Sequence, residues 1–206
     1  MGSVTTWFRY LFTKLHTSIG SALQSYEIGQ ISEKQVHDRV WRNLLQGRLT
    51  FTHRFKGEEM SPTFKTQGET LLVRSLPLAS PRSVFVGDVV MFKDPEDPNK
   101  LIVRRVAALE GDEMISTNEN DKPFTLEKGQ CWVLADNHSL VPKVLSAQDS
   151  RTFGPLDMKN IVGRAIYSSH SSVDHGHVQN SDEAMRRDSA VLAVELDLDE
   201  ITRQSS

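Results

Sequence analysis

Short β-type segments separated by turn residues dominate the middle of this 206-residue chain. From residue 49 to about residue 168, runs rich in aliphatic residues alternate with breakers such as DPEDPN and NENDKP. Strands of this length, broken in this way, favour an antiparallel sheet. The sequence therefore predicts an all-β unit over residues 49–168, built from the runs ETLLVRSLP, GDVVMFKDP, KLIVRRVAALEGDEM, GQCWVLADN and IVGRAIY.

Residues 1–48 predict an appendage of two helices instead. Apolar residues recur at helical spacing in VTTWFRYLFTKLHTSIGSALQSYE, and no acidic residue precedes Glu27. Ser32 and Gln35 form a capping box for the second helix, which Gly47 ends. A basic, acid-poor amphipathic helix is typical of a mitochondrial targeting segment and of a helix in a membrane surface. A helix packed on its own domain is the third interpretation.

No segment has the roughly 18 to 20 apolar residues that a transmembrane helix needs. The net charge of -3 and the pI near 6.2 give no electrostatic reason to expect a nucleic-acid site. The single cysteine, Cys131, excludes an internal disulfide and fits a buried strand position. No phosphate-binding loop or cofactor motif is present in the sequence, so no cofactor is expected.

Residues 169–206 predict a polar linker followed by an acidic tail. His170, His175 and His177 suggest a metal cluster, but no Cys or carboxylate stands at ligand spacing, so no metal site is expected. Apolar and acidic residues alternate in AVLAVELDLDE. This alternation predicts an added strand, or a segment that pairs with the sheet edge of a partner.

Four sequence boxes occur in one order: GEEMSPTF (57–64), GDVVMF (87–92), LIVRRVAALEGDEM (101–114) and LADNHSL…SAQDSRTFGPLDMKNIVGRA (134–165). Together they resemble the type I signal peptidases, family S26, and most closely the mitochondrial inner membrane protease subunits. The resemblance covers about residues 50–168. It implies a signal-peptidase/LexA-like antiparallel β core that binds targeting peptides as an extended strand. It also implies a mitochondrial protein, in the matrix or associated with the inner membrane.

The chain departs from the family at the reacting positions. The family's first box reads Gly-x-Ser-Met-x-Pro-Thr, and Gly57, Met60, Pro62 and Thr63 fix its register here. The family's nucleophilic serine is therefore replaced by Glu59.

The resemblance places the family's general base, a lysine, at Arg104, while the arginine that follows it is kept as Arg105. In the last box, Ala135 replaces a glycine, and Ala147 stands where a serine is common, with Ser146 one position away.

These replacements remove the chemistry of a serine-lysine dyad. A serine attacks only when a base takes its proton, and a buried lysine can supply a neutral amine. Arginine keeps its proton at a pKa above about 12. A carboxylate at position 59 provides no alkoxide-like nucleophile. We therefore interpret the chain as catalytically degenerate, with no residue assigned a catalytic role.

Ser61 is the outside candidate for a relocated nucleophile, with His138 as its base and Asp136 as the group that orients the histidine. On an extended segment Ser61 would share a face with position 59. It would still lie about 6–7 Å along the strand, beyond the tolerance for attack. An ordinary serine before Pro62 is the simpler interpretation.

If the fold is kept, positions 59 and 104 face each other, and Glu59 and Arg104 are expected to form a charge-assisted pair. The remaining family positions are expected to be structural or to shape the groove. Asp149 and Arg151 are expected to pair, and Asp136 and Asn137 to cap their loop. The expected structural and groove residues are Gly57, Met60, Pro62, Arg105, Asp136, Asn137, Asp149, Ser150 and Arg151.

Three functions remain open. The favoured one is a non-catalytic signal-peptidase-like protein that binds a peptide or a paired peptidase subunit through the family groove. The second is a structural subunit of a large mitochondrial assembly, such as the ribosome or a membrane complex. The third is an active serine endopeptidase that processes targeting peptides. Peripheral membrane contact is compatible with each of them.

Overall fold

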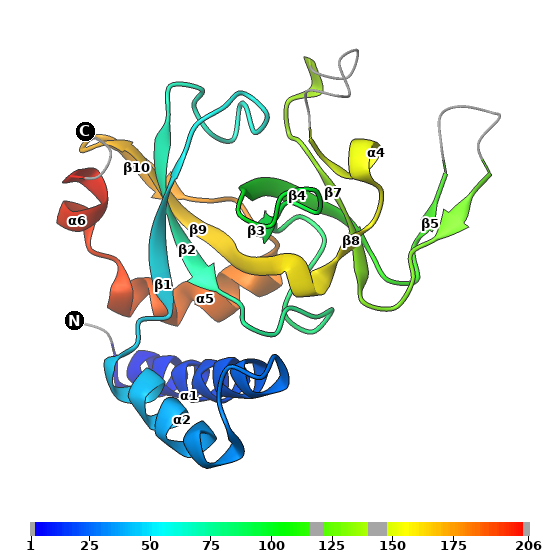
Figure 1. Ribbon diagram of the computed structural model, residues 1–206. Coiled ribbons are helices and arrows are strands. Elements are labelled where there is room, and N and C mark those ends of the chain that lie inside the picture. The colour runs from blue at the N-terminus through cyan, green and yellow to red at the C-terminus, as the bar shows by residue number, and fades with distance from the viewer. Residues whose placement is uncertain (1–2, 116–121, 140–147, 204–206) are drawn as a thin grey trace.

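The computed structural model describes residues 3–115, 122–139 and 148–203 of the chain (Figure 1). Two helices come first, a sheet follows, and two helices come last. The helices are α1 (Val4–Glu27), α2 (Glu33–Gln46), α4 (Ser150–Phe153), α5 (Asp182–Glu195) and α6 (Leu198–Arg203), with a 3-10 turn at Met158–Asn160. The strands are β1 (Thr50–Phe55), β2 (Glu69–Ser75), β3 (Val89–Lys93), β4 (Leu101–Leu109), β5 (Glu113–Met114), β6 (Phe124–Thr125), β7 (Gln130–Leu134), β8 (Leu156–Asp157), β9 (Ile161–Ser171) and β10 (Asp174–His177).

The main sheet is antiparallel and curled, with the order β1-β2-β9-β3-β4-β7-β8 and with β10 paired to β9. The all-β core with an N-terminal helical extension, predicted from the sequence, is therefore confirmed. β9 pairs with both β2 and β3, so it joins the first half of the sheet to the second. Gly163 lies in β9 against the paired strand β2. An added Cβ at this position would lie 2.6 Å from the Arg74 carbonyl oxygen, so β2 leaves no room for a side chain there.

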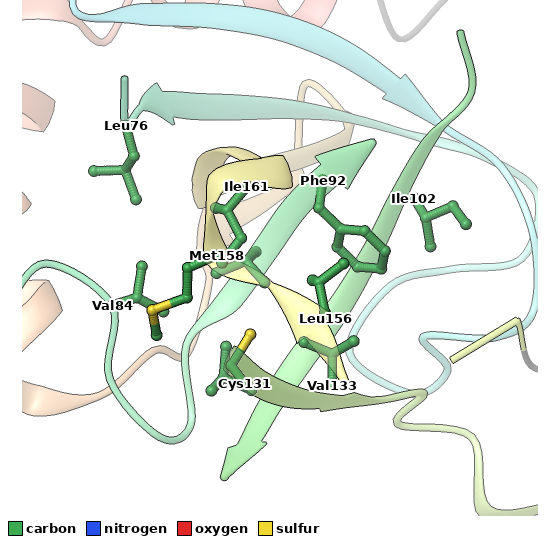
Figure 2. Close-up of a cluster of buried hydrophobic side chains, with 11 residues drawn as sticks. Leu76, Val84, Phe92, Ile102, Cys131, Val133, Leu156, Met158 and Ile161 are labelled. Atoms are coloured by element: carbon green, nitrogen blue, oxygen red, sulfur yellow. The ribbon is translucent and has the colours of Figure 1, made fainter. Parts of the chain in front are cut away.

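One hydrophobic core cluster packs against the half of the sheet formed by β3, β4, β7 and β8. Figure 2 shows side chains of these strands, including the fully buried Phe92 and Val133, together with Leu76, Val84, Met158 and Ile161 from adjoining segments. Cys131 belongs to this cluster, and burial raises the pKa of its thiol to about 12. The cysteine is therefore a buried strand residue, as expected.

The N-terminal helices form with the predicted bounds. Ser3 caps α1, and the backbone N–H of Ser32 donates to the Gln35 side chain at the start of α2. α1 packs against α5 through a small cluster that includes Tyr10 and Val191. The predicted apolar face of α2 does not enter a core, because no residue of this helix is buried.

The predicted C-terminal strand is wrong. The segment that alternates apolar and acidic residues belongs to α5 and α6. Most buried positions of α5 recur at helical spacing; they are Ala184, Asp188, Ala190, Val191, Leu192 and Glu195. Ser181 caps the helix by accepting from the backbone N–H of Ala184, and two acidic residues occupy its first turn.

The predicted polar linker is also wrong over much of its length. β9 continues to Ser171 and turns into β10. The Asn180 side chain then accepts from the backbone N–H of Val89 and donates to the carbonyl of Ala165. These buried hydrogen bonds attach the segment to β3 and β9.

Buried charges attach α5 to the sheet. Arg164 on β9 is almost completely buried and donates to Asp88 at 2.8 Å and to Asp188 of α5 at 2.7 and 2.9 Å. Asp88 also accepts from the hydroxyl of Ser181, the N-cap of α5. Arg74 on β2 lies 3.9 Å from Asp188. The positive charges of two arginines are therefore balanced by the negative charges of two aspartates in this buried cluster.

We expect Asp188→Ala to lower the free energy of unfolding by about 3–5 kcal/mol, because it leaves buried arginine charge uncompensated. Urea denaturation measures this loss. Glu183→Ala is the matched control on the same helix, since Glu183 pairs with Arg186 and Arg187 at the surface. Its cost is expected to stay below about 1 kcal/mol. Equal losses in the two variants would contradict this account.

Candidate functional site

The segment that carries the family's nucleophile position forms a compact turn after β1. The backbone N–H of Ser61 donates to the Glu58 carbonyl at 3.1 Å, and that of Phe64 donates to Met60 at 2.9 Å. Met60 and Phe64 are buried in the core between β1, β2 and β4. The extended conformation assumed for this segment is therefore wrong, because these hydrogen bonds fold it back on itself.

Gly57 opens this turn with a backbone φ of 148°, a conformation that side-chain-bearing residues rarely adopt. The Glu59 carboxylate lies directly over this glycine, where an added Cβ would clash with it. Gly57 is thus required both for the turn and for the position of the Glu59 side chain.

The loop after β7 holds the turn in place. The backbone N–H of Asn137 donates to the Glu59 carbonyl at 3.0 Å, and the Asn137 side chain donates to the Glu58 carbonyl at 2.9 Å. Thr63 donates its hydroxyl to Asp136 at 2.5 Å. Asn137 caps its own loop, as expected, by accepting from the backbone N–H of Ser139, and Asp136 and Asn137 both fix the segment that contains position 59.

Arg105 on β4 connects this loop to the rest of the site. Its guanidinium donates to both carboxylate oxygens of Asp136, at 2.9 and 2.7 Å. It also donates to the carbonyls of Gly87 and Gln179, at 2.7 and 2.8 Å. Gln179 was missed from the sequence, because its contribution is a backbone carbonyl and no side-chain pattern marks it.

Asp149, Ser150 and Arg151 brace the opposite side of β7. Arg151 donates to both oxygens of the fully buried Asp149, at 3.0 and 2.6 Å, so the expected pairing is present. The same carboxylate accepts from the backbone N–H of Ala135 at 2.9 Å, and the Ser150 hydroxyl accepts from Val133. Burial alone would raise the pKa of Asp149, but the hydrogen bonds from Arg151 and Ala135 outweigh it and lower this pKa.

Arg104, at the family's base position, is 3% exposed and points into the interior beside β3. One of its nitrogens donates to the Val103 carbonyl at 2.6 Å. Burial lowers the pKa of this guanidinium, while Glu59 and then Asp149 act in the opposite direction. An arginine starts so far above neutral pH that it still keeps its proton.

Glu59 and Arg104 attract each other electrostatically, and the hydrogen-bonded pair expected between them stays a prediction. Glu59 is the carboxylate that acts most strongly on Arg104. The Glu59 side chain lies over Gly57, and one nitrogen of Arg104 donates to the Val103 carbonyl on its own strand. A glutamate is longer than a serine, so it need not point where the family's hydroxyl points.

Ser61 and His138 are not brought together as a dyad. Ser61 is half-buried within the turn, whereas His138 is exposed after β7, and within the described chain no hydrogen bond joins them. Asp136, the proposed orienting group, accepts hydrogen bonds from Arg105 and Thr63. Ser146 and Ala147 lie outside the described residues.

The histidines of the C-terminal region have other contacts. The Tyr167 hydroxyl lies 2.6 Å from His175, and His170 contacts the Gly68 carbonyl. In residues 3–115, 122–139 and 148–203 no group of three metal-ligating side chains could hold an ion.

Sequence comparisons agree with this architecture. The model of the signal peptidase family, peptidase S26, matches residues 44–122. The mitochondrial ATP-independent inner membrane protease subunit 2 of Arabidopsis thaliana is 49% identical over 203 residues, which cover 98% of each chain. The chain belongs to the signal peptidase family, peptidase S26.

Two relatives of lower identity match about half of this chain. The mitochondrial inner membrane protease subunit 2 of Saccharomyces cerevisiae is 34% identical over 119 residues, or 54% of this chain and 63% of the yeast protein. Subunit 1 of Schizosaccharomyces pombe is 33% identical over 113 residues, or 53% of this chain and 67% of its own. These relatives place the protein in the mitochondrion. Among the helices described, none is both long and apolar enough to cross a membrane.

We expect Asp149→Asn to change how stability depends on pH. A carboxyl whose pKa is lowered by folding stabilises the protein above its unfolded pKa of about 4, and this stabilisation is lost as pH falls through the folded pKa. The variant should therefore be less stable at neutral pH and should lose less stability on acidification than the wild type. Urea midpoints between about pH 6 and pH 2 measure both effects.

Asp157→Asn is the control for this experiment. The pKa of Asp157 is also lowered, since Lys159 outweighs the effect of its partial burial, but its side chain is 45% exposed. A smaller change is expected, because solvent screens this pair. A wild-type pH profile in Asp149→Asn would show that the buried pairing does not contribute as described.

Proposed function

We propose that this chain is a non-catalytic member of the signal peptidase family that binds an extended peptide or a paired subunit through the family's groove. The observation that carries the proposal is the replacement of both reacting groups, with Glu59 at the nucleophile position and the buried Arg104 at the base position. A guanidinium cannot accept the proton of a serine, and position 59 offers no hydroxyl.

The scaffold around these two positions supports a binding role. Asp136, Asn137 and Arg105 hold the turn at residues 57–64 through direct hydrogen bonds. A groove wall fixed in this way is preorganised, which lowers the entropy cost of binding a peptide. The relatives are named as protease subunits, which supports a paired subunit as the alternative occupant of the groove.

Fluorescent peptides that carry the sequences of inner-membrane precursor cleavage sites test the loss of catalysis. We expect the wild-type chain to bind such peptides without cleaving them, and Ser61→Ala to leave both properties unchanged. Glu59→Ser/Arg104→Lys restores both reacting groups and is the variant in which cleavage could arise. Cleavage by the wild type that Ser61→Ala abolishes would overturn the proposal and identify an active peptidase with a relocated nucleophile.

A charge reversal tests whether the groove itself binds. Glu59→Lys places a cation at the family's nucleophile position, where the native carboxylate attracts Arg104, and should weaken peptide binding by about tenfold or more, measured by fluorescence anisotropy. Glu58→Lys is the matched control, because it makes the same charge change at an exposed neighbouring side chain. Its affinity should stay within about twofold of the wild type.

The remaining results of this experiment separate the alternatives. Equal losses in the two lysine variants would mean that only overall charge matters. An absence of peptide binding by the wild type would point to a structural subunit, whose partner would be found by co-purification from mitochondria.

A further inference from the structure

α1 turns Tyr10 and several small side chains toward the protein, and most of its large apolar side chains toward solvent. The buried residues of the helix are Tyr10, Ser18, Gly20, Ala22 and Ser25. Phe8 is 70% exposed and Phe12 is 73% exposed. The exposed apolar side chains of the helix are Val4, Trp7, Phe8, Leu11, Phe12, Leu15, Ile19, Leu23 and Tyr26. Contiguous apolar surface of this kind marks an interaction site rather than ordinary protein surface.

Polar contacts on the inner side of α1 fix which residues face outward. The Tyr10 hydroxyl donates to Glu195 of α5 at 2.6 Å, and Arg74 of β2 donates to the Thr17 hydroxyl at 2.7 Å. Arg9 donates to the carbonyl of Arg186 at 3.0 Å. The helix is therefore docked in one orientation, and its outer apolar surface is a fixed feature of the fold.

α2 extends the same kind of surface. It packs along α1, and none of its residues is buried. Trp41 is 49% exposed and Leu45 is 73% exposed. We call α1 and α2 together the N-terminal hairpin (residues 4–46).

The charge of this region differs in sign from that of the remaining chain. Residues 1–48 contain six Lys and Arg against three Asp and Glu, whereas residues 49–206 contain 18 against 24. No acidic residue precedes Glu27. A positive region on an otherwise acidic protein is complementary to an anionic surface.

We propose that the N-terminal hairpin binds the surface of an anionic lipid bilayer, with the exposed side chains of α1 inserted at the boundary between headgroups and acyl chains. A helix that combines an apolar face, aromatic residues and a basic excess has the chemistry of an interfacial helix. The charge asymmetry favours an anionic bilayer, because the basic excess of residues 1–48 complements anionic headgroups while the remaining chain is acidic. This inference does not depend on the proposed function of the groove.

Bilayer binding would also determine where the degenerate site lies. β1 follows α2 in the chain, and the turn at residues 57–64 follows the end of β1 (Figure 1). The six residues of β1 separate the two by about 20 Å. The groove would therefore remain open to the aqueous phase while the hairpin is bound.

Vesicle flotation of the full-length protein tests the proposal. We expect binding to phosphatidylcholine vesicles that contain about one fifth cardiolipin, and clearly weaker binding to phosphatidylcholine alone or at high salt. Phe8→Gln/Phe12→Gln should lower the partition coefficient on the anionic vesicles by about tenfold or more, because two exposed aromatic side chains no longer enter the bilayer.

Ile115→Gln/Val173→Gln is the matched control, since these side chains are 73% and 92% exposed and lie outside the hairpin. It should bind vesicles like the wild type, and circular dichroism should show that both double variants are folded. Equal losses in the two variants would mean nonspecific adhesion and would overturn the proposal. The proposal would also be overturned if Phe8→Gln/Phe12→Gln bound vesicles as well as the wild type does. It would be overturned too if the wild-type protein did not bind vesicles, and a protein partner would then remain for this surface.

Discussion

The fork between Arg105 and Asp136 is the interaction on which the site depends. Through it, a residue of β4 holds the loop after β7, and that loop in turn holds the turn at residues 57–64. The other donors of Arg105 reach the carbonyls of Gly87 and Gln179. One guanidinium thus fixes four segments that are distant in sequence, which only a planar group with five donors can do.

This arrangement is compatible with the proposed replacement of the family's reacting groups. The hydrogen bonds that hold the turn at residues 57–64 come from Arg105, Asp136 and Asn137, and from the backbone of the turn. None of these bonds needs a serine at position 59 or a lysine at position 104. The scaffold therefore does not constrain the side chains at these two positions, and a match to the scaffold is no evidence of activity.

The sequence predicted the strands for clear physical reasons. Period-two apolar runs and turn residues determine strands, and Gly57, Met60 and Pro62 anchor the first box at one register. The sequence did not predict α5, because the apparent alternation at residues 192–198 is typical of a strand. The buried pattern of the helix begins eight residues earlier, at Ala184, after the Ser181 cap.

Side-chain direction was the part of the site that could not be predicted. Register places residues 59 and 104 at the family's reacting positions, but it does not say where a longer side chain points. The Glu59 carboxylate lies over Gly57 because glycine leaves space there, and Arg104 reaches a carbonyl of its own strand. Both choices depend on local packing that no sequence period encodes.

α5 connects the N-terminal hairpin to the sheet. Glu195 at its end accepts from Tyr10 of α1 and from the backbone N–H groups of Leu49 and Thr50, where β1 begins. Asp188, two turns earlier, binds Arg164 in β9. β9 pairs with β3, and β3 pairs with the strand that carries Arg104 and Arg105. These buried polar contacts and strand pairings fix the orientation of the hairpin relative to the strand that carries Arg104 and Arg105. A surface bound by the hairpin would therefore set the direction in which the groove faces and leave the charges inside it unchanged.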